Sequence, residues 1–566
     1  MAYRPSRRQV IAGASALALS GSGVSHAAVI ARGVVFEDLR GEGQRRAGDR
    51  GVAGVMVCNG RDVVLTGADG SFALPVEPGE SVFVIKPPNW AVPTSVGGVP
   101  VFSYTYQPEA TARYLQTPFP VVGPTGPLPA SLDFPLLRQE EAADFEALLV
   151  SDTQPENVTE LGYVRDDIVA AMLGVRAAFG INHGDVVGDD LSLYPRYLQV
   201  LNATGVPWHH CPGNHDINHA ARDDRSSRET WKLTFGPRHY AFRYADATFL
   251  VLDNVEYLGR GRYRGAFGPR QLEFVRNVLR RVPAEHLIVL SMHIPLRCHL
   301  DPANPADTTS DYRALLRLLA GHPHSVSFAG HLHATEHHYL DDEQGPRGGP
   351  HHHHVLTAAS GSWWSGPPDH RGIPFADSTD GTPNGFHILS VAGNRYTTRF
   401  VPAATKMPSQ LRVIVDGPHR ANGGAGRGSD RLGLSVPLDA VGQCRVIANV
   451  FDGGPRTRVA LEILGRSERT AMTAVSMPDP LMLELFKGEC PRKAWVEAVA
   501  SSHIWQAPLP DGLRPGAHVL LVRAFDEYGR EHVVRAVLEV TPLRPDRSRS
   551  IVTRQPADPA GMWTLR

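Results

Sequence analysis

The chain has 566 residues, too many for one hydrophobic core, and this length predicts about three domains. A hydrophobic content of 42% and a charged content of 20% are those of an ordinary globular protein. The net charge is -1, which argues against a polyanion such as nucleic acid as a partner. Five scattered cysteines, without a CxxC spacing, argue against a disulfide scaffold.

Residues 1–28 have the pattern of a cleaved export signal. Arg7 and Arg8 precede the short apolar stretch 10–19, and the small-x-small segment 25–27 follows it. The apolar stretch is too short to span a bilayer, and no other run is long enough to be a membrane helix. The arginine pair resembles the bacterial twin-arginine signal, so we expect a periplasmic or secreted protein. An ordinary secretory signal with an accidental arginine pair is the alternative.

Two flanking regions have the pattern of β modules. Residues 29–138 contain short alternating strands separated by turn signals, which predicts a β sandwich. This stretch resembles the prealbumin-like or Cna-B-like modules of bacterial surface proteins. Strands and turns dominate again in residues 405–566, which predicts a second β-rich module, a sandwich as well.

Residues 139–404 alternate strands with helices. A buried strand at 145–150 precedes a helical pattern over 156–180, and later helical patterns cover 268–282 and 310–321. Apolar strands lie between these helical patterns. The alternation predicts an α/β layered domain between the two β modules.

Polar side chains follow five of the predicted strands, at the point where each strand ends. They are Asp152 and Gln154, His183 and Asp185, Asn214 with His215 and Asp216, His293, and His331 with His333. Ligands bind at the carboxyl ends of strands in open α/β sheets, so we expect these loops to meet at one edge. Carboxylate, amide oxygen and imidazole together form a ligand set for Zn, Mn or Fe.

The order of these clusters resembles the motif series of the calcineurin-like metallophosphoesterases. The matching stretches are "SDTQ", "HGDVVGD", "CPGNHD", "SMHIP" and "AGHLHA", within residues 140–403. The resemblance implies a four-layer α/β/β/α sandwich that hydrolyses phosphate esters with a metal-bridging hydroxide. It assigns metal one to Asp152, Gln154, Asp185 and His333, and metal two to Asp185, Asn214, His293 and His331, with Asp185 as the bridge.

The same resemblance gives roles to the two residues after Asn214. His215 faces the substrate and donates a proton to the leaving oxygen, or stabilises it. Asp216 is expected to orient His215 and to raise its pKa.

Gln154 departs from the family pattern, which usually has histidine at this position. The sequence matches a branch with a D-x-Q first motif and β modules before and after the catalytic core. Gln154 could bind metal one through its carbonyl oxygen, bind it through water, or leave a looser site. An amide oxygen is a harder ligand than imidazole, which favours Mn or Fe.

Two further stretches are candidates near the site. His351 to His354 are interpreted either as exposed imidazoles or as groups close to the metals. Trp363, Trp364 and Asp369 could form the rim of a substrate pocket, although core packing explains the tryptophan pair equally simply.

The sequence therefore predicts an exported dinuclear-metal phosphoesterase acting on phosphate mono- or diesters. Its substrate would be a small phosphate ester or an envelope polymer. The alternative is a non-catalytic envelope-binding protein in which Gln154 marks a degenerate metal site. A protein phosphatase is a third interpretation, which the export signal disfavours.

Overall fold

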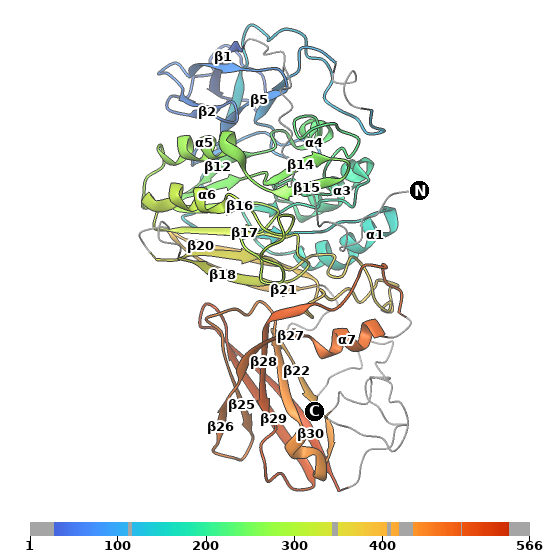
Figure 1. Cartoon of the computed structure of the whole chain (residues 1–566). Helices are drawn as coiled ribbons and strands as arrows, with labels where there is room; N and C mark the ends of the chain where they lie inside the picture. Colours follow the sequence, from blue (N-terminus) through green and yellow to red (C-terminus); the bar gives the residue numbers. More distant parts are fainter. Residues whose placement is uncertain are drawn as a thin grey trace.

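The computed structural model describes residues 28–110, 116–341, 349–403, 409–417, 434–487 and 490–542. The predicted export signal, apart from residue 28, lies outside these described residues. Figure 1 shows three parts stacked along one axis: an N-terminal β module, a central α/β core and a C-terminal β module.

Two four-stranded sheets form the N-terminal β module, in the orders β4-β1-β8-β6 and β3-β2-β5-β7. Val35 and Leu74 of the first sheet share one core with Val57 and Val82 of the second, so the sheets pack as the predicted sandwich. The strands are β1 (Val29–Glu37), β2 (Met56–Cys58), β3 (Val63–Leu65), β4 (Ser71–Val76), β5 (Glu80–Ile85), β6 (Trp90–Ala91), β7 (Ser103–Tyr106) and β8 (Phe134–Arg138).

The central core contains two mixed sheets. The five-stranded sheet has the order β11-β10-β9-β20-β21, and β9, β10 and β11 run parallel. Its strands are β9 (Asp144–Val150), β10 (Phe179–Asn182), β11 (Trp208–His210), β20 (Gly385–Ala392) and β21 (Arg395–Pro402).

The six-stranded sheet has the order β12-β13-β16-β17-β19-β18. Its strands are β12 (Tyr240–Tyr244), β13 (Ala247–Val251), β16 (Leu287–Ser291), β17 (Ser325–Ala329), β18 (Glu336–Leu340) and β19 (His351–Val355). A separate hairpin consists of β14 (Val255–Gly259) and β15 (Arg262–Gly265).

Helices cover the outer faces of the two sheets. Leu148 and Val150 of β9 pack with α1 (Val158–Tyr163) and α3 (Tyr194–Leu201), while Ala147 and Leu149 point into the cluster shared with the six-stranded sheet. That cluster continues to α5 (Gly268–Leu279) and α6 (Tyr312–Leu318). The order helix, sheet, sheet, helix confirms the predicted four-layer fold class. The remaining short elements of the core are a π-helical turn η2 (Val164–Val169), α2 (Ala170–Met172), η3 (Leu191–Leu193), η4 (Asn202–Thr204), α4 (Glu229–Phe235) and η5 (Leu319–Gly321).

The first helical stretch is shorter than the predicted span 156–180. Helical structure ends at Met172, and Gly174 follows with a φ of 85°. A glycine in the left-handed region is a usual end for a helix, and the chain then enters β10 at Phe179.

The C-terminal β module is again a sandwich, with sheets β22-β24-β28-β27 and β23-β30-β29-β25-β26 around one core. Its elements are β22 (Leu411–Asp416), β23 (Ser435–Pro437), η7 (Leu438–Gln443), β24 (Arg445–Val450), β25 (Arg458–Ile463), β26 (Arg469–Ala471), β27 (Thr473–Pro478), α7 (Pro480–Lys487), β28 (Ala500–Pro508), β29 (Gly516–Phe525) and β30 (Glu531–Thr541). The predicted flanking all-β regions are therefore confirmed.

All five cysteines lie in the described residues, and their thiols are free. No helix of the described residues is long and apolar enough to cross a membrane.

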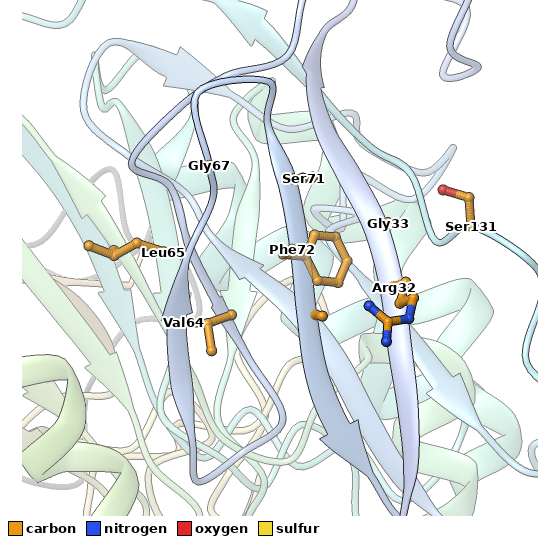
Figure 2. A pocket seen from close by; sticks show the side chains of 9 residues that line it. Arg32, Gly33, Val64, Leu65, Gly67, Ser71, Phe72 and Ser131 are labelled. Carbon is orange, nitrogen blue, oxygen red and sulfur yellow. The ribbon is translucent and has the colours of Figure 1, made fainter.

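A hollow on the N-terminal β module, shown in Figure 2, is lined by Arg32, Val64, Leu65, Phe72 and their neighbours.

Candidate metal centre

The predicted polar side chains lie in loops that leave the carboxyl ends of five strands. Asp152, Asp185 and Asn214 follow β9, β10 and β11 of the five-stranded sheet, whereas His293 and His331 follow β16 and β17 of the six-stranded sheet. The site residues therefore come from two sheets, and not from one edge of a single sheet as the sequence predicted. The loops after both sets of parallel strands meet at this site, because His293 Nε2 lies 3.0 Å from Asn214 Oδ1 and 3.2 Å from Asp185 Oδ2.

Five of the predicted ligands have a strained backbone. The φ angles are 53° at Asp152, 43° at Gln154, 51° at Asp185, 75° at His331 and 52° at His333. Residues other than glycine rarely adopt this left-handed region, and such strain persists mainly where a site requires it. These backbones turn sharply at the strand ends, which directs the side chains of successive loops toward one another.

Two motif glycines allow the loops to approach closely. A Cβ atom at Gly213 would lie 2.1 Å from Oδ1 and 2.2 Å from the backbone nitrogen of Asp185. One at Gly330 would lie 1.7 Å from Ser151 Oγ and 2.3 Å from Asp152 Oδ2. Neither position has room for a side chain, so glycine is required for the backbone to reach the carboxylates.

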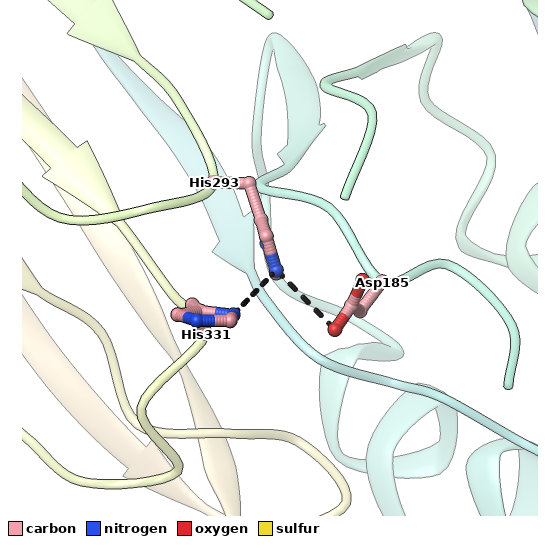
Figure 3. Close-up of side chains that lie close together, drawn as sticks. All are labelled: Asp185, His293 and His331. Atoms are coloured by element: carbon pink, nitrogen blue, oxygen red, sulfur yellow. Dashed lines mark hydrogen bonds and ion pairs between the residues drawn. The ribbon is translucent and has the colours of Figure 1, made fainter. Parts of the chain in front are cut away.

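His293 lies at the centre of one group of donor atoms. Its Nε2 atom lies 3.0 Å from Asn214 Oδ1, 3.2 Å from Asp185 Oδ2 and 3.2 Å from His331 Nδ1. Figure 3 shows Asp185, His293 and His331 pointing toward one another from three loops. The donor atoms of these three residues lie within 4.8 Å of one another, so they could hold one metal ion.

A second group of donors surrounds His333. Its Nε2 atom lies 2.9 Å from Gln154 Oε1 and 3.8 Å from Asp152 Oδ1. All three side chains are buried. The backbone nitrogen of His331 donates to the Asp152 carboxylate, which connects the two groups.

The hydrogen bonds of the two buried imidazoles leave their Nε2 atoms available to bind a metal. His293 Nδ1 donates to the carbonyl oxygen of His183 at 2.9 Å, and His333 Nδ1 donates to that of Gly361 at 2.5 Å. In a neutral ring the Nε2 atom is then an acceptor, yet each Nε2 faces an amide oxygen. Facing acceptors are what a cation between them would satisfy, and ligating histidines usually donate their other nitrogen in this manner. The residues therefore fit a pair of metal ions.

The ionisation of the site follows from its charges. Burial by itself raises the pKa of Asp185, but His293 and His215 together lower it far below its ordinary range. Burial opposes the charging of His293, yet Asp185 raises the pKa of that ring to about 9, and a cation at Nε2 would replace this proton. For His333 burial dominates and lowers the pKa to about 4.

His215 lies at the edge of the site and remains partly exposed. Its Nδ1 atom lies 2.7 Å from Asp189 Oδ1, and its Nε2 atom lies 4.0 Å from Asp185 Oδ2. Burial lowers the pKa of His215, but the charges of Asp185 and Asp189 outweigh it and raise the pKa to about 10. The ring is therefore held in a proton-donating state.

The prediction that Asp216 orients His215 is wrong. Asp216 accepts hydrogen bonds from the Tyr194 hydroxyl at 2.9 Å and from the backbone nitrogens of Val186 at 3.1 Å and Gly213 at 2.9 Å. It thereby joins the loop after β10 to the loop after β11, and acts on His215 only through its charge. The orienting carboxylate is Asp189.

Three more residues lie next to the site: Asp189 and Asp307, which were not predicted as site residues, and Trp363, which was a candidate for the pocket rim. Asp189 has a φ of 69° and also lies 3.1 Å from His219 Nε2. Asp307 Oδ1 lies 3.4 Å from His331 Nε2. The ring of Trp363 stacks on His333 with centroids 3.6 Å apart. The second aspartate in "GDVVGD" was the available signal for Asp189.

Some of the other residues that the sequence suggested lie beside the site, and others pack in the core. Trp364 is buried and donates its indole N–H to the Thr153 carbonyl, so it packs in the core. Asp369 pairs with Arg371. The interpretation of His351 to His354 as exposed imidazoles is wrong, because all four are buried in β19. Of these, His353 accepts a hydrogen bond from the backbone nitrogen of Leu296, in the loop that contains His293.

The solved structures that are similar to this chain include a purple acid phosphatase and PhoD. The first is a purple acid phosphatase, PPD1, from yellow lupin (Lupinus luteus) seeds, with 12% identity and a TM-score of 0.34. The match covers 66% of this chain and 66%, just under two thirds, of that chain. The second is PhoD, with 13% identity and a TM-score of 0.33, covering 65% of this chain and 85% of that chain. No curated protein gives a significant match.

Family models match three consecutive parts of the sequence. Residues 39–116 match the N terminal of Calcineurin-like phosphoesterase, and residues 353–532 match its C terminal. The model of Calcineurin-like phosphoesterase itself matches residues 147–335, which contain all seven predicted metal ligands. The chain therefore belongs to the calcineurin-like phosphoesterases, which are metal-dependent phosphoester hydrolases.

Proposed function

We propose that the protein is an exported phosphoesterase that hydrolyses phosphate mono- or diesters at a two-metal site. The observation that carries this proposal is the pairing of buried acceptors. His293 Nε2 faces Asn214 Oδ1, and His333 Nε2 faces Gln154 Oε1, while both Nδ1 atoms donate to backbone carbonyls. Lone pairs that face each other in a buried site call for cations.

The two groups of donors define which residues would hold each ion. Asp152, Gln154 and His333 would hold one ion, and Asn214, His293 and His331 the other, with Asp185 between them. When bound, two ions of Mn, Fe or Zn would activate water and neutralise charge on the phosphoryl oxygens. The amide oxygen of Gln154 favours a hard ion, Mn or Fe, at the first position.

His215 is proposed to protonate the leaving oxygen of the ester. Its Nε2 atom is on the side of Asp185 and its ring is partly exposed, so an ester held at the site can reach it. Asp189 holds the ring through Nδ1, which leaves Nε2 as the proton donor. Asp216 is proposed to position the loops around Gly213 and Asp185, and not to take part in proton transfer.

The flanking modules are proposed to frame access to this site. We propose an export signal at 1–28, a β module at 29–138, the phosphoesterase domain at 139–404 and a C-terminal module at 405–566. Export is supported by the arginine pair and the short apolar stretch near the start of the chain. The substrate would then be a small phosphate ester or an envelope polymer.

Elemental analysis combined with ester hydrolysis tests the proposal. The purified full chain should contain two catalytic metal ions and should hydrolyse p-nitrophenyl phosphate or bis(p-nitrophenyl) phosphate. Asp185→Asn should lower the occupancy of both ions and abolish hydrolysis, because its carboxylate is proposed to bridge the two ions. The exposed Asp223→Asn is the control and should behave like the wild type. Full metal occupancy in Asp185→Asn, or a wild type that stays inert with added Mn, Fe or Zn, would overturn the proposal.

A further inference from the structure

A second cluster of buried histidines lies away from the catalytic site, between the core and the C-terminal β module. It contains His337 of β18, His354 of β19, His387 of β20 and Asp452, which follows β24. His337 and His354 are directly paired across the two antiparallel strands. The four residues are buried, and they come from both sheets of the core and from the C-terminal module.

Three imidazoles converge on one carboxylate oxygen. Asp452 Oδ1 lies 2.8 Å from His354 Nε2, 3.1 Å from His387 Nε2 and 3.2 Å from His337 Nε2. The donor atoms of His337, His354 and Asp452 all lie within 4.8 Å of one another. Asp452 has a φ of 61°, so its backbone is strained at the position that directs its carboxylate into the cluster.

Hydrogen bonds account for two of the three contacts, because His337 Nε2 and His387 Nε2 bond to Asp452 Oδ1 at 3.2 and 3.1 Å, but they leave His354 without one. Both ring nitrogens of His354 lack a hydrogen-bond partner, although Nε2 lies 2.8 Å from the carboxylate oxygen. His387 Nδ1 also lacks a hydrogen-bond partner. An imidazole buried without hydrogen bonds is costly, so the position of His354, 2.8 Å from the carboxylate oxygen, suggests that it and its neighbours are ligands of one ion.

The distances from Asp452 Oδ1 to the three imidazoles are compatible with a tetrahedral ion. With metal–ligand bonds of about 2.0–2.1 Å, the ligands of a tetrahedral zinc site are separated by about 3.3 Å. The three nitrogen–oxygen distances, 2.8, 3.1 and 3.2 Å, are close to this separation. Three imidazoles and one carboxylate also form a donor set that zinc prefers, and a buried set of four leaves no open position.

A supporting hydrogen bond holds one of the imidazoles in place. His337 Nδ1 lies 2.9 Å from His352 Nε2, and His352 Nδ1 lies 2.8 Å from the Tyr396 hydroxyl. Ligating histidines are commonly oriented through their second nitrogen in this way. Gly454 contributes as well, since a Cβ atom there would lie 2.6 Å from the Cβ of His337.

We propose that His337, His354, His387 and Asp452 form a closed structural site for a divalent cation, with zinc as the matching ion. The site joins the two core sheets to the C-terminal β module and is separate from the catalytic pair of ions. Its role is to fix the module on the core, because all four donors are buried and none is available to substrate.

Zinc binding by paired variants tests this site. Full-length Asp185→Asn protein, whose catalytic site is impaired, is incubated with zinc alone, desalted and measured for zinc content. Adding His354→Gln should remove one further zinc per chain. Adding His351→Gln should remove none, because His351 lies on the same strand but bonds to Ser325 and Ser327.

The result does not depend on how many ions the catalytic site retains, since the measurement is the difference between two variants. Asp452→Asn, which is nearly isosteric, should lose the same equivalent and serves if His354→Gln does not fold. X-ray absorption at the zinc edge should show a shell of nitrogen and oxygen at about 2.0–2.1 Å in the protein with His351→Gln. Zinc content in the His354 variant, or in the Asp452 variant, equal to that of the His351 variant would overturn the proposal.

Discussion

At the scale of single residues, the chemistry of His215 depends on two carboxylates. Asp185 and Asp189 raise its pKa to about 10, against the effect of burial. The ring is therefore protonated at neutral pH, as a proton donor to a leaving oxygen must be. Because Asp189 occupies Nδ1, the proton that is available to an ester is the one on Nε2.

Replacing His215 should separate catalysis from metal binding. His215→Ala is expected to lower turnover by about 100- to 10,000-fold, the usual contribution of a general acid, while the metal content stays at the wild-type level. His219→Ala is the matched control, because His219 also contacts Asp189 but has no contact with Asp185 among the described interactions, and its turnover should remain near wild type. Turnover and elemental analysis of both variants check this. Loss of metal from His215→Ala would contradict its role as a proton donor.

Residue types could be predicted from the sequence, but contacts between neighbours in space could not. Asp216 is adjacent to His215 in sequence, and this suggested the pair. The two side chains diverge because Asp216 is held by Tyr194 and two backbone nitrogens. Asp189 reaches His215 through a left-handed backbone turn, which no local pattern indicates.

At the scale of elements, the site depends on how closely the loops after β10 and β11 approach each other. Gly213 brings the second loop against the backbone nitrogen and carboxylate of Asp185. Asp216 then ties the same two loops together through Gly213 and Val186. A shift of about 1 Å in such a constellation can cost about 100-fold in rate.

Gly213→Ala should therefore impair the site without unfolding the protein. Its Cβ atom would meet the Asp185 backbone nitrogen at 2.2 Å, and this atom cannot move away alone. We expect weaker metal binding and a loss of activity of about 100-fold or more. Gly162→Ala, in α1, meets no atom within 4 Å and should retain activity and metal. Metal titration and steady-state kinetics of the two variants test this prediction. Equal metal affinity and activity in both variants would show that the close contact between the two loops is unimportant.

The strand-end loops could be predicted because each strand has a simple apolar pattern followed by polar residues. Two features of the elements could not. The helix after β9 ends at Met172, before a left-handed glycine that the apolar pattern conceals. The four histidines of β19 look like a surface tag, yet β19 is an interior strand between β17 and β18, and its partner Asp452 lies in another module.

At the scale of the whole molecule, the C-terminal β module is joined to the core by an arginine that pairs with buried carboxylates. Arg412 of β22 contacts Asp377 Oδ2 of the core at 2.5 Å and Asp479 Oδ2 at 3.2 Å. Both carboxylates are fully buried, whereas Arg412 retains 18% exposure. The sequence predicted the two flanking modules, but not this contact, because its members are far apart along the chain.

Removing this arginine should destabilise the protein more than removing an arginine from an exposed ion pair. Arg412→Met leaves Asp377 and Asp479 buried without its positive charge, a change that usually costs about 3–5 kcal/mol. Arg445→Met is the control, since the pair of Arg445 with Asp416 keeps the arginine 39% exposed and is expected to contribute about 0–1 kcal/mol. Thermal and denaturant unfolding should show a clear loss for Arg412→Met and almost none for Arg445→Met. If both variants lost stability equally, the buried pairs would not be what holds the C-terminal module on the core.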